Sequence, residues 1–181
     1  EGYVINETHR GVIVAPFDAS ATHEINELRI LLECRLAVAA LAHMTPKHFA
    51  QLSAVQREFE AAEARKDREA VRALNYRFHR QLYALANLPQ TLHFVQVLWA
   101  KYPFDLINLI GGRPGRAAAE HRRLLKALKA RDKTAVTAAL REHIDAGWRE
   151  LKSSIEKQPP APAKANAQRS QAVRAAGARP D

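Results

Sequence analysis

Apolar residues recur every three or four positions through most of this 181-residue chain, which is the spacing of a helix face that packs inward. The clearest stretch is 71–85, where Val71, Leu74, Phe78 and Leu82 mark one such face. Comparable stripes predict helices over 24–43, 46–65, 71–85, a segment that starts near 90, 116–130 and 133–155. The pattern therefore predicts an all-α fold.

Start and stop signals separate these segments. Thr45 and Pro46 form a helix cap followed by proline at the first helical position. Pro103 has no backbone N–H and should kink or split the fourth helix, and Gly-Gly-Arg-Pro-Gly at 111–115 predicts a loop. Further helix caps are expected at Ser20 or Thr22, at Asp67 and at Asp132. Since the connections are short, we expect an antiparallel bundle of six helices over 18–157.

The two ends of the chain differ from this helical body. Residues 1–17 contain two short strand-like pieces separated by a polar turn, and a lone two-stranded ribbon is marginal in water. We therefore expect 1–17 to be the edge of a larger unit, in a chain that begins inside a longer gene product. Residues 158–181 are rich in proline and alanine and poor in large apolar residues, which predicts a disordered basic tail.

Composition narrows the class of protein. The formal net charge of +9 hints at nucleic acid or anionic ligands, but the tail 158–181 carries four basic residues and one acidic residue, and the rest of the charge is spread over helix faces. The single Cys34 excludes an intrachain disulfide and a cysteine-based zinc knuckle. The longest apolar run, 36–42, is too short to span a bilayer. We expect a soluble cytoplasmic protein with no membrane partner.

Four polar side chains fall on inward faces where apolar residues are expected: Asn75, His79, His121 and His143. Imidazole is a good ligand for Zn²⁺ and Ni²⁺, and an amide oxygen is a weaker one. Each unsatisfied buried imidazole would cost on the order of 1–3 kcal/mol, and one shared ion would remove all three costs. We predict a divalent metal at these four residues, although each histidine taken alone also fits a core residue bonded to a carbonyl group.

Arg29 is a candidate for binding a ligand. It lies between Ile25 and Leu32 on the inward side of the first helix, where a guanidinium group could hold a carboxylate through two hydrogen bonds. The alternative is a side chain that reaches water or pairs with Glu33, four residues later. The sequence alone leaves both interpretations open.

Two other functions fit a helical bundle that contains histidines. A di-iron enzyme needs Glu-x-x-His on facing helices, and no histidine here has a glutamate three residues before it. A three-histidine hydrolase would need a positioned acid or base, and Glu120 and Glu142 each precede a candidate ligand by one residue, so they point away from it. A metal-dependent enzyme is therefore the weaker alternative, and a purely structural dimerisation bundle is a third.

Several motifs, in order and spacing, resemble the GntR-type bacterial transcription regulators, in the branch whose effector domain is called FCD. The resemblance covers about residues 20–155, and residues 1–17 resemble the wing hairpin that closes the winged helix-turn-helix domain of that family. The matching pieces are Glu27-Leu28-Arg29 followed by Glu33, Asn75-Tyr76-Arg77-Phe78-His79, Ala86-Asn87, Glu120-His121, the stretch 124–128 and Glu142-His143-Ile144.

The resemblance implies a helical domain that senses a small carboxylic acid, in many members beside a divalent metal such as Zn²⁺ or Ni²⁺. The family pattern is Asp-x-x-x-His followed by a histidine on each of two later helices, and His79, His121 and His143 fall on the histidine positions. Asn75 falls on the aspartate position, which removes a negative charge and should weaken metal binding. Arg29 falls where the family often has an arginine that meets the effector carboxylate.

The resemblance also implies partners for the parent protein. Members of the family act as homodimers on operator DNA, and effector binding changes how the two DNA readers are arranged. The recognition helix that reads bases in the major groove is absent from this sequence. We therefore expect this chain to be the sensing half of a regulator, which binds DNA through an N-terminal domain, and not an enzyme.

Overall fold

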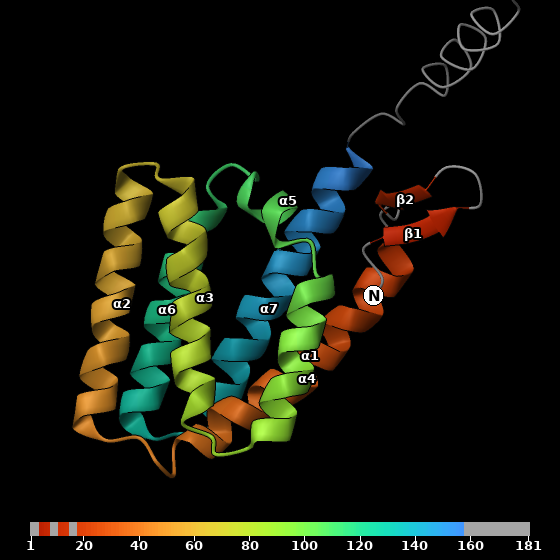
Figure 1. The fold of residues 1–181 in the computed structure, drawn as a ribbon. Helices are drawn as coiled ribbons and strands as arrows, with labels where there is room; N and C mark the ends of the chain where they lie inside the picture. The colour runs from red at the N-terminus through yellow and green to blue at the C-terminus, as the bar shows by residue number, and fades with distance from the viewer. Residues whose placement is uncertain (1–3, 8–10, 15–17, 158–181) are drawn as a thin grey trace, which may run out of the picture.

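Seven helices follow a two-stranded ribbon in the computed structural model, which describes residues 4–7, 11–14 and 18–157 (Figure 1). The strands are β1 (Val4–Glu7) and β2 (Gly11–Val14). The helices are α1 (Ala19–Ala40), α2 (Pro46–Ala64), α3 (Arg68–Ala84), α4 (Pro89–Lys101), α5 (Phe104–Asn108), α6 (Arg113–Ala130) and α7 (Lys133–Glu156). The all-α fold expected from the apolar stripes is confirmed.

The helices form one bundle in which α1 packs along α7 and also contacts α3 and α4 (Figure 1). On the other side α2 packs against α3 and α6, and α6 packs against α7. The short helix α5 contacts α6 and α7. As a result α3, α6 and α7, which carry the three candidate histidines, all border the interior of the bundle.

The N-terminal ribbon is an antiparallel pair in which Val4 lies opposite Val14 and Glu7 opposite Gly11. Its origin as the wing of a winged helix-turn-helix domain stays a prediction. The predicted tail 158–181 lies outside the described residues.

The helix count differs from the expected six because Pro103 divides the fourth segment. Tyr102 is extended, with φ −92° and ψ 133°, as the residue before a proline tends to be, and α4 ends at Lys101. A five-residue helix, α5, then begins at Phe104. The prediction that Pro103 interrupts this segment is correct, and the interruption is complete, which gives seven helices.

Three helix starts lie earlier than the apolar stripes predict, and one of them, that of α3 at Arg68, directly follows the predicted cap Asp67. The first helix begins at Ala19, because the carboxylate of Asp18 accepts hydrogen bonds from the backbone N–H groups of Ser20 (2.8 Å) and Ala21 (3.1 Å). Asp18, and not Ser20 or Thr22, is therefore the cap. Helix α6 begins at Arg113, inside the expected loop, since Gly112 takes a positive φ of 71° and Pro114 is tolerated in a first turn.

Large apolar side chains from these helices fill the interior. Fully buried examples from several helices are Leu36, Leu52, Phe78, Leu82, Leu124, Leu128 and Leu140. The interior also holds buried charged and polar side chains: Arg29, Glu33, Gln56, His79, Arg113, Glu120, His121 and His143. None of the described helices combines the length and the apolar content needed to cross a membrane. The buried polar residues are the ones that define the site.

Candidate metal and ligand site

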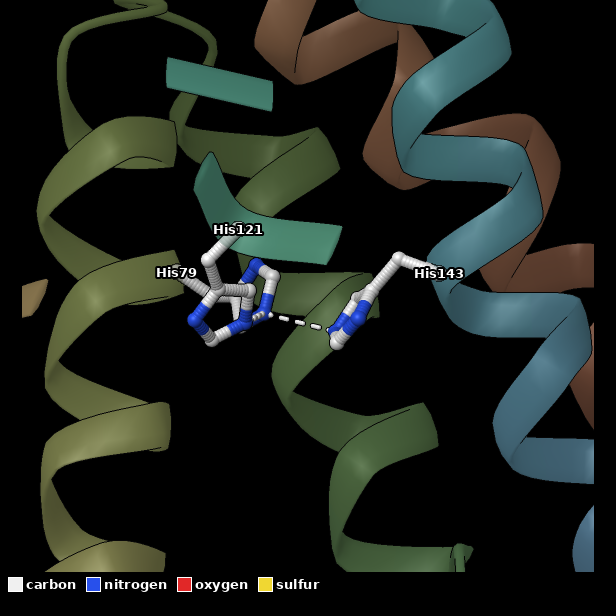
Figure 2. Close-up of side chains that lie close together, drawn as sticks. All are labelled: His79, His121 and His143. Carbon is white, nitrogen blue, oxygen red and sulfur yellow. Dashed lines mark hydrogen bonds between the residues drawn. The ribbon is translucent and has the colours of Figure 1, made fainter. Parts of the chain in front are cut away.

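The structure brings three of the four predicted metal ligands together. His79 on α3, His121 on α6 and His143 on α7 are buried, and one nitrogen atom from each lies within 4.8 Å of the other two (Figure 2). Nε2 of His79 is 3.1 Å from Nε2 of His143 and 3.2 Å from Nε2 of His121. The three rings thus direct their Nε2 atoms at one point in the interior of the bundle.

A neighbouring amide fixes the protonation of His121. The Nε2 group of Gln56 donates hydrogen bonds to the backbone oxygen of Ala118 (3.1 Å) and to Glu60 (2.9 Å), so Oε1 of Gln56 is the end that faces His121. This oxygen lies 2.9 Å from Nδ1 of His121 and can only accept. Nδ1 of His121 therefore carries the hydrogen, and Nε2 keeps a free lone pair in the neutral ring.

A buried carboxylate fixes His143 in the same way. Oε2 of Glu120 lies 2.7 Å from Nδ1 of His143, and Arg113 donates two hydrogen bonds of 2.9 Å to the same carboxylate. Burial raises the pKa of Glu120, but the hydrogen bonds from His143 and Arg113 outweigh that effect and hold the pKa below 4.5. Glu120 is therefore ionised and accepts the Nδ1 hydrogen of His143.

His79 is fixed through a tyrosine. The hydroxyl group of Tyr83 donates to Oε2 of Glu33 at 2.8 Å, so its oxygen accepts from Nδ1 of His79 at 3.2 Å. Burial and the carboxylate of Glu33 raise the pKa of Tyr83 well above 10, which keeps the hydroxyl protonated. Each of the three histidines thus has its Nδ1 hydrogen directed outward and its Nε2 lone pair directed inward, the arrangement of metal-bound imidazoles.

The converging nitrogen atoms call for a cation. Burial lowers the pKa of His79 and of His121 well below 6.5, and it lowers the pKa of His143 despite the hydrogen bond to Glu120. Neutral rings with these tautomers have no hydrogen between their Nε2 atoms, so the lone pairs repel one another. One nitrogen from each ring lies within 4.8 Å of the other two, so a divalent ion such as Zn²⁺, which prefers imidazole ligands, could be held by all three. The donor set fits a divalent metal.

Asn75 lies one turn before His79 on α3 and is half-buried. It lines the same cavity as His79 and His143. The fourth predicted residue is therefore placed beside the histidines, on the wall of the cavity. Its role as a metal ligand stays a prediction.

The cavity next to the histidines has a volume of about 440 Å³, which suits a small molecule. Four aromatic side chains form much of its wall: Tyr76, Trp99, Tyr102 and Phe104. On its exposed side Arg72 of α3 and Asp105 of α5 form an ion pair of 2.8 Å. The cavity therefore has apolar walls, a group of nitrogen donors at one side and a charged pair near solvent.

Arg29 pairs with Glu33, as one interpretation of its sequence position predicts, and its role in binding a ligand carboxylate stays a prediction. It lines the cavity, and its Nε also donates to Oε1 of Glu33 at 2.9 Å. Its guanidinium carbon lies 4.3 Å from the centre of the Tyr102 ring and 4.8 Å from that of Phe104. Arg29 is thus a buried cation that is held by one carboxylate and two aromatic rings and borders the space where a ligand would lie.

The residues that orient the histidines were missed by the sequence pattern. Gln56 follows Val55 on an apolar stripe, and this is the same signal that singled out the histidines. Glu33 was considered only as a partner for Arg29, and Glu120 was set aside because it points away from its neighbour His121. The structure shows that Glu120 serves a histidine of another helix, His143, which its sequence position cannot reveal.

Comparisons with known proteins place the helical domain in a family. The model of the FCD domain matches residues 24–146, which include all five predicted site residues. The HTH-type transcriptional regulator McbR of Escherichia coli (strain K12) is 28% identical over 125 residues, which are 66% of this chain and 56% of that protein. The chain thus spans little more than half the length of this curated relative.

Solved structures share the fold. The structure of E. coli McbR/YncC has a TM-score of 0.75 and 23% identity, and the match covers 84% of this chain and 78% of that one. A GntR family member from Pseudomonas syringae pv. tomato str. DC3000 has a TM-score of 0.65 and 20% identity, over 86% of this chain and 66% of that one. With two thirds of its length matched by the family model, this chain belongs to the FCD domain family.

Proposed function

We propose that this chain is the effector-binding and dimerising domain of a DNA-binding transcriptional regulator, and that it binds a small carboxylic acid at a divalent metal. The observation that carries the proposal is the convergence of three Nε2 lone pairs beside a cavity of about 440 Å³. Zn²⁺ or Ni²⁺ would be held by His79, His121 and His143, with the amide oxygen of Asn75 as a further donor. The bound ion would supply a positive charge that attracts an anionic ligand.

The charge of the site favours an anionic effector. All four proposed ligands are neutral, and the buried charges around them cancel in pairs, Arg29 with Glu33 and Arg113 with Glu120. A divalent ion would therefore add two positive charges that the buried side chains do not compensate. A carboxylate that enters the cavity would compensate this charge in a poorly hydrated setting, where electrostatic attraction is strong.

The cavity wall suggests which parts of the ligand go where. The guanidinium group of Arg29 can bind a carboxylate oxygen, and the rings of Trp99 and Phe104 can cover an apolar part of the molecule. Arg72 and Asp105 lie at the exposed side and can meet a polar end. A small organic acid with both an anionic group and an apolar portion fits this distribution.

Binding would act on DNA through the parent protein. A ligand that prefers one of two homodimer arrangements shifts the population toward it, and so changes the spacing of DNA-reading domains on the operator. An N-terminal domain outside this sequence would contact the DNA bases of the operator, and the regulator would act in the cytoplasm.

An enzymatic role is not favoured, because the two buried carboxylates of the described residues, Glu33 and Glu120, are both held by arginines. Neither carboxylate is free to act as a general base.

Metal content and calorimetry test the proposal. Protein dialysed against Zn²⁺ or Ni²⁺ should retain about one ion per chain, and His121→Gln should lose it, because the remaining two imidazoles form a much weaker site. His93→Ala serves as a matched control, since His93 is exposed on α4 and lies away from the cluster. The metal-loaded protein should then give binding heat with a panel of small carboxylic acids.

The result that would overturn the proposal is equally plain. If the wild-type chain remains metal-free at saturating Zn²⁺ and Ni²⁺, the proposed metal site is wrong. If the metal-loaded chain gives no binding heat with any acid, and Arg29→Ala behaves like wild type, the proposal of a carboxylate effector is wrong.

A further inference from the structure

A continuous series of hydrogen bonds joins the cavity wall to one of the three histidines. Nε of Arg29 donates to Oε1 of Glu33 at 2.9 Å, and Nε1 of Trp99 donates to the same oxygen at 2.9 Å. The other oxygen of Glu33 accepts from Tyr83 at 2.8 Å, and Tyr83 in turn contacts Nδ1 of His79 at 3.2 Å. Helices α1, α3 and α4 meet at the carboxylate of Glu33, whose side chain is only 1% exposed.

The donors and acceptors along this series all have defined directions. Glu33 can only accept, so Arg29, Trp99 and Tyr83 must each donate to it. The hydroxyl hydrogen of Tyr83 is donated to Glu33, so the hydroxyl oxygen of Tyr83 must accept a hydrogen bond from Nδ1 of His79. Any change in the charge felt at Glu33 therefore alters how strongly Tyr83 draws the Nδ1 hydrogen of His79.

The hydrogen-bond partners of the other two histidines do not reach the cavity, although His143 itself lines it. Gln56, which holds His121, and Glu120, which holds His143, do not line the cavity of about 440 Å³. Arg29, Glu33 and Trp99 do line it. Among the described residues that fix the three rings, only the series through Tyr83 reaches the surface that a ligand would touch.

We propose that Tyr83 is a positioning residue that couples the ligand cavity to the metal through His79. The inference rests on the proposed function. A carboxylate that binds Arg29 draws the guanidinium group away from Glu33 and leaves the charge of Glu33 less compensated. Tyr83 then becomes a stronger acceptor, Nε2 of His79 becomes a better donor, and the metal is held more tightly.

The coupling is reciprocal, since two binding events that affect one another do so by the same factor in both directions. A bound metal polarises His79, and this change is felt at Glu33 and at the indole N–H of Trp99. The metal alone should therefore be detectable at the cavity wall.

Removal of one hydroxyl group tests the first part of the proposal. Tyr83→Phe keeps the ring and should weaken Zn²⁺ binding by about 10- to 100-fold in chelator competition, the usual effect of losing a partner of a metal-bound histidine. The visible spectrum of the Co²⁺ form should also shift, because the donor strength of His79 changes. His93→Ala is the control, since His93 is exposed on α4 and does not line the cavity, and it should leave both readouts unchanged.

Fluorescence tests whether the signal reaches the cavity. In a Trp148→Phe background Trp99 is the single tryptophan, and saturating Zn²⁺ should shift its emission. The shift should vanish when Tyr83→Phe is added, although Zn²⁺ still saturates the site at higher concentration. Zn²⁺ has a filled d shell and causes no paramagnetic quenching, so a direct effect of the ion on the indole ring is small.

A variant that is expected to raise Zn²⁺ affinity distinguishes the coupling from a simple loss of folding. Trp99→Phe removes a donor from Glu33, which should raise Zn²⁺ affinity by about two- to threefold through the stronger pull on His79. Structural damage would instead lower it. Unchanged or weaker Zn²⁺ binding in Trp99→Phe contradicts the coupling.

The outcomes separate this inference from the proposed function. If the wild-type chain binds no Zn²⁺, both the proposed function and the coupling are wrong. If the wild type binds Zn²⁺ and Tyr83→Phe has the same affinity and Co²⁺ spectrum, only the coupling fails. Weaker Zn²⁺ binding with an unchanged Co²⁺ spectrum and an unchanged Trp99 shift at saturation also overturns it, because Tyr83 is then merely structural.

Discussion

At the scale of single residues, the interior of this bundle is defined by histidines whose hydrogens are all placed by their neighbours. Gln56, Glu120 and Tyr83 each accept or orient one Nδ1 hydrogen and so leave three Nε2 lone pairs facing one another. Such a cluster is stable without metal only while the rings remain neutral. Protonation adds like charges in a buried space, where they repel strongly.

A pH dependence of folding follows from this neutrality. Because burial lowers the pKa of all three histidines below 6.5, the unfolded chain binds more protons than the folded chain once the pH falls below 6.5. The contribution of the three neutral histidines to the free energy of unfolding is complete above pH 6.5 and is lost as the pH falls. Each histidine that stays neutral contributes a slope of about 1.4 kcal/mol per pH unit. Urea unfolding in EDTA at pH 7.5 and 5.5 should show a lower free energy of unfolding at pH 5.5.

One histidine variant provides the comparison. His143→Gln removes one of the three titrating groups and should make the fall between pH 7.5 and 5.5 shallower. His93→Ala should not, since His93 is exposed. Equal free energies of unfolding at the two pH values in the wild type would contradict the burial of neutral histidines.

The sequence pattern found the histidines but not their partners, for a physical reason. A polar residue on an apolar stripe is visible in the sequence, so His79, His121 and His143 could be selected. Which side chain meets each ring depends on how neighbouring helices pack. Glu120 reaches His143 across the contact of α6 and α7, and Gln56 reaches His121 across the contact of α2 and α6.

At the scale of helices, the fold depends on how each segment begins and ends. Thr45, Asp67 and Asp132 cap α2, α3 and α7 as the sequence predicts, because a short polar side chain precedes each apolar stripe. The start of α1 was placed at 24, five residues late, since its first turn carries no large apolar residue. Helix existence was therefore predictable from the stripes, while boundaries depended on local capping contacts.

The cap of α1 can be tested directly. Asp18→Ala removes the acceptor for two backbone N–H groups and should lower the free energy of unfolding by about 1 kcal/mol. Asp18→Asn keeps an acceptor oxygen and should lose much less. Urea unfolding monitored by circular dichroism measures both variants, and equal stability of wild type and Asp18→Ala would show that Ser20 or Thr22 can replace the cap.

At the scale of the whole molecule, apolar side chains on two neighbouring helices face solvent in the isolated chain. Leu28 and Leu31 on α1 are 41% and 66% exposed, and Phe94 and Val97 on α4 are 59% and 41% exposed. Helices α1 and α4 pack against each other, so the exposed side chains lie on neighbouring helices. Exposed apolar groups of this size favour association, and a second copy of the chain is the partner that the proposed function requires.

Charge substitution on that surface tests the dimer. Leu31→Glu combined with Phe94→Glu should convert a dimer into a monomer in size-exclusion chromatography with light scattering, because two buried carboxylates would oppose each other across the interface. Leu109→Glu alters an equally exposed leucine that follows α5, and the dimer should persist. A wild type that is monomeric, or a double variant that remains dimeric, would contradict this assignment of the surface.

The distribution of the three histidines over α3, α6 and α7 has a consequence for biosynthesis. His143 lies on the last described helix, which also packs along the first. While a ribosome is still extending the chain toward α7, the two earlier imidazoles have no third partner and α1 lacks the helix along which it packs. The three-histidine cluster can therefore form only after synthesis has passed α7, so the proposed metal site would be completed late.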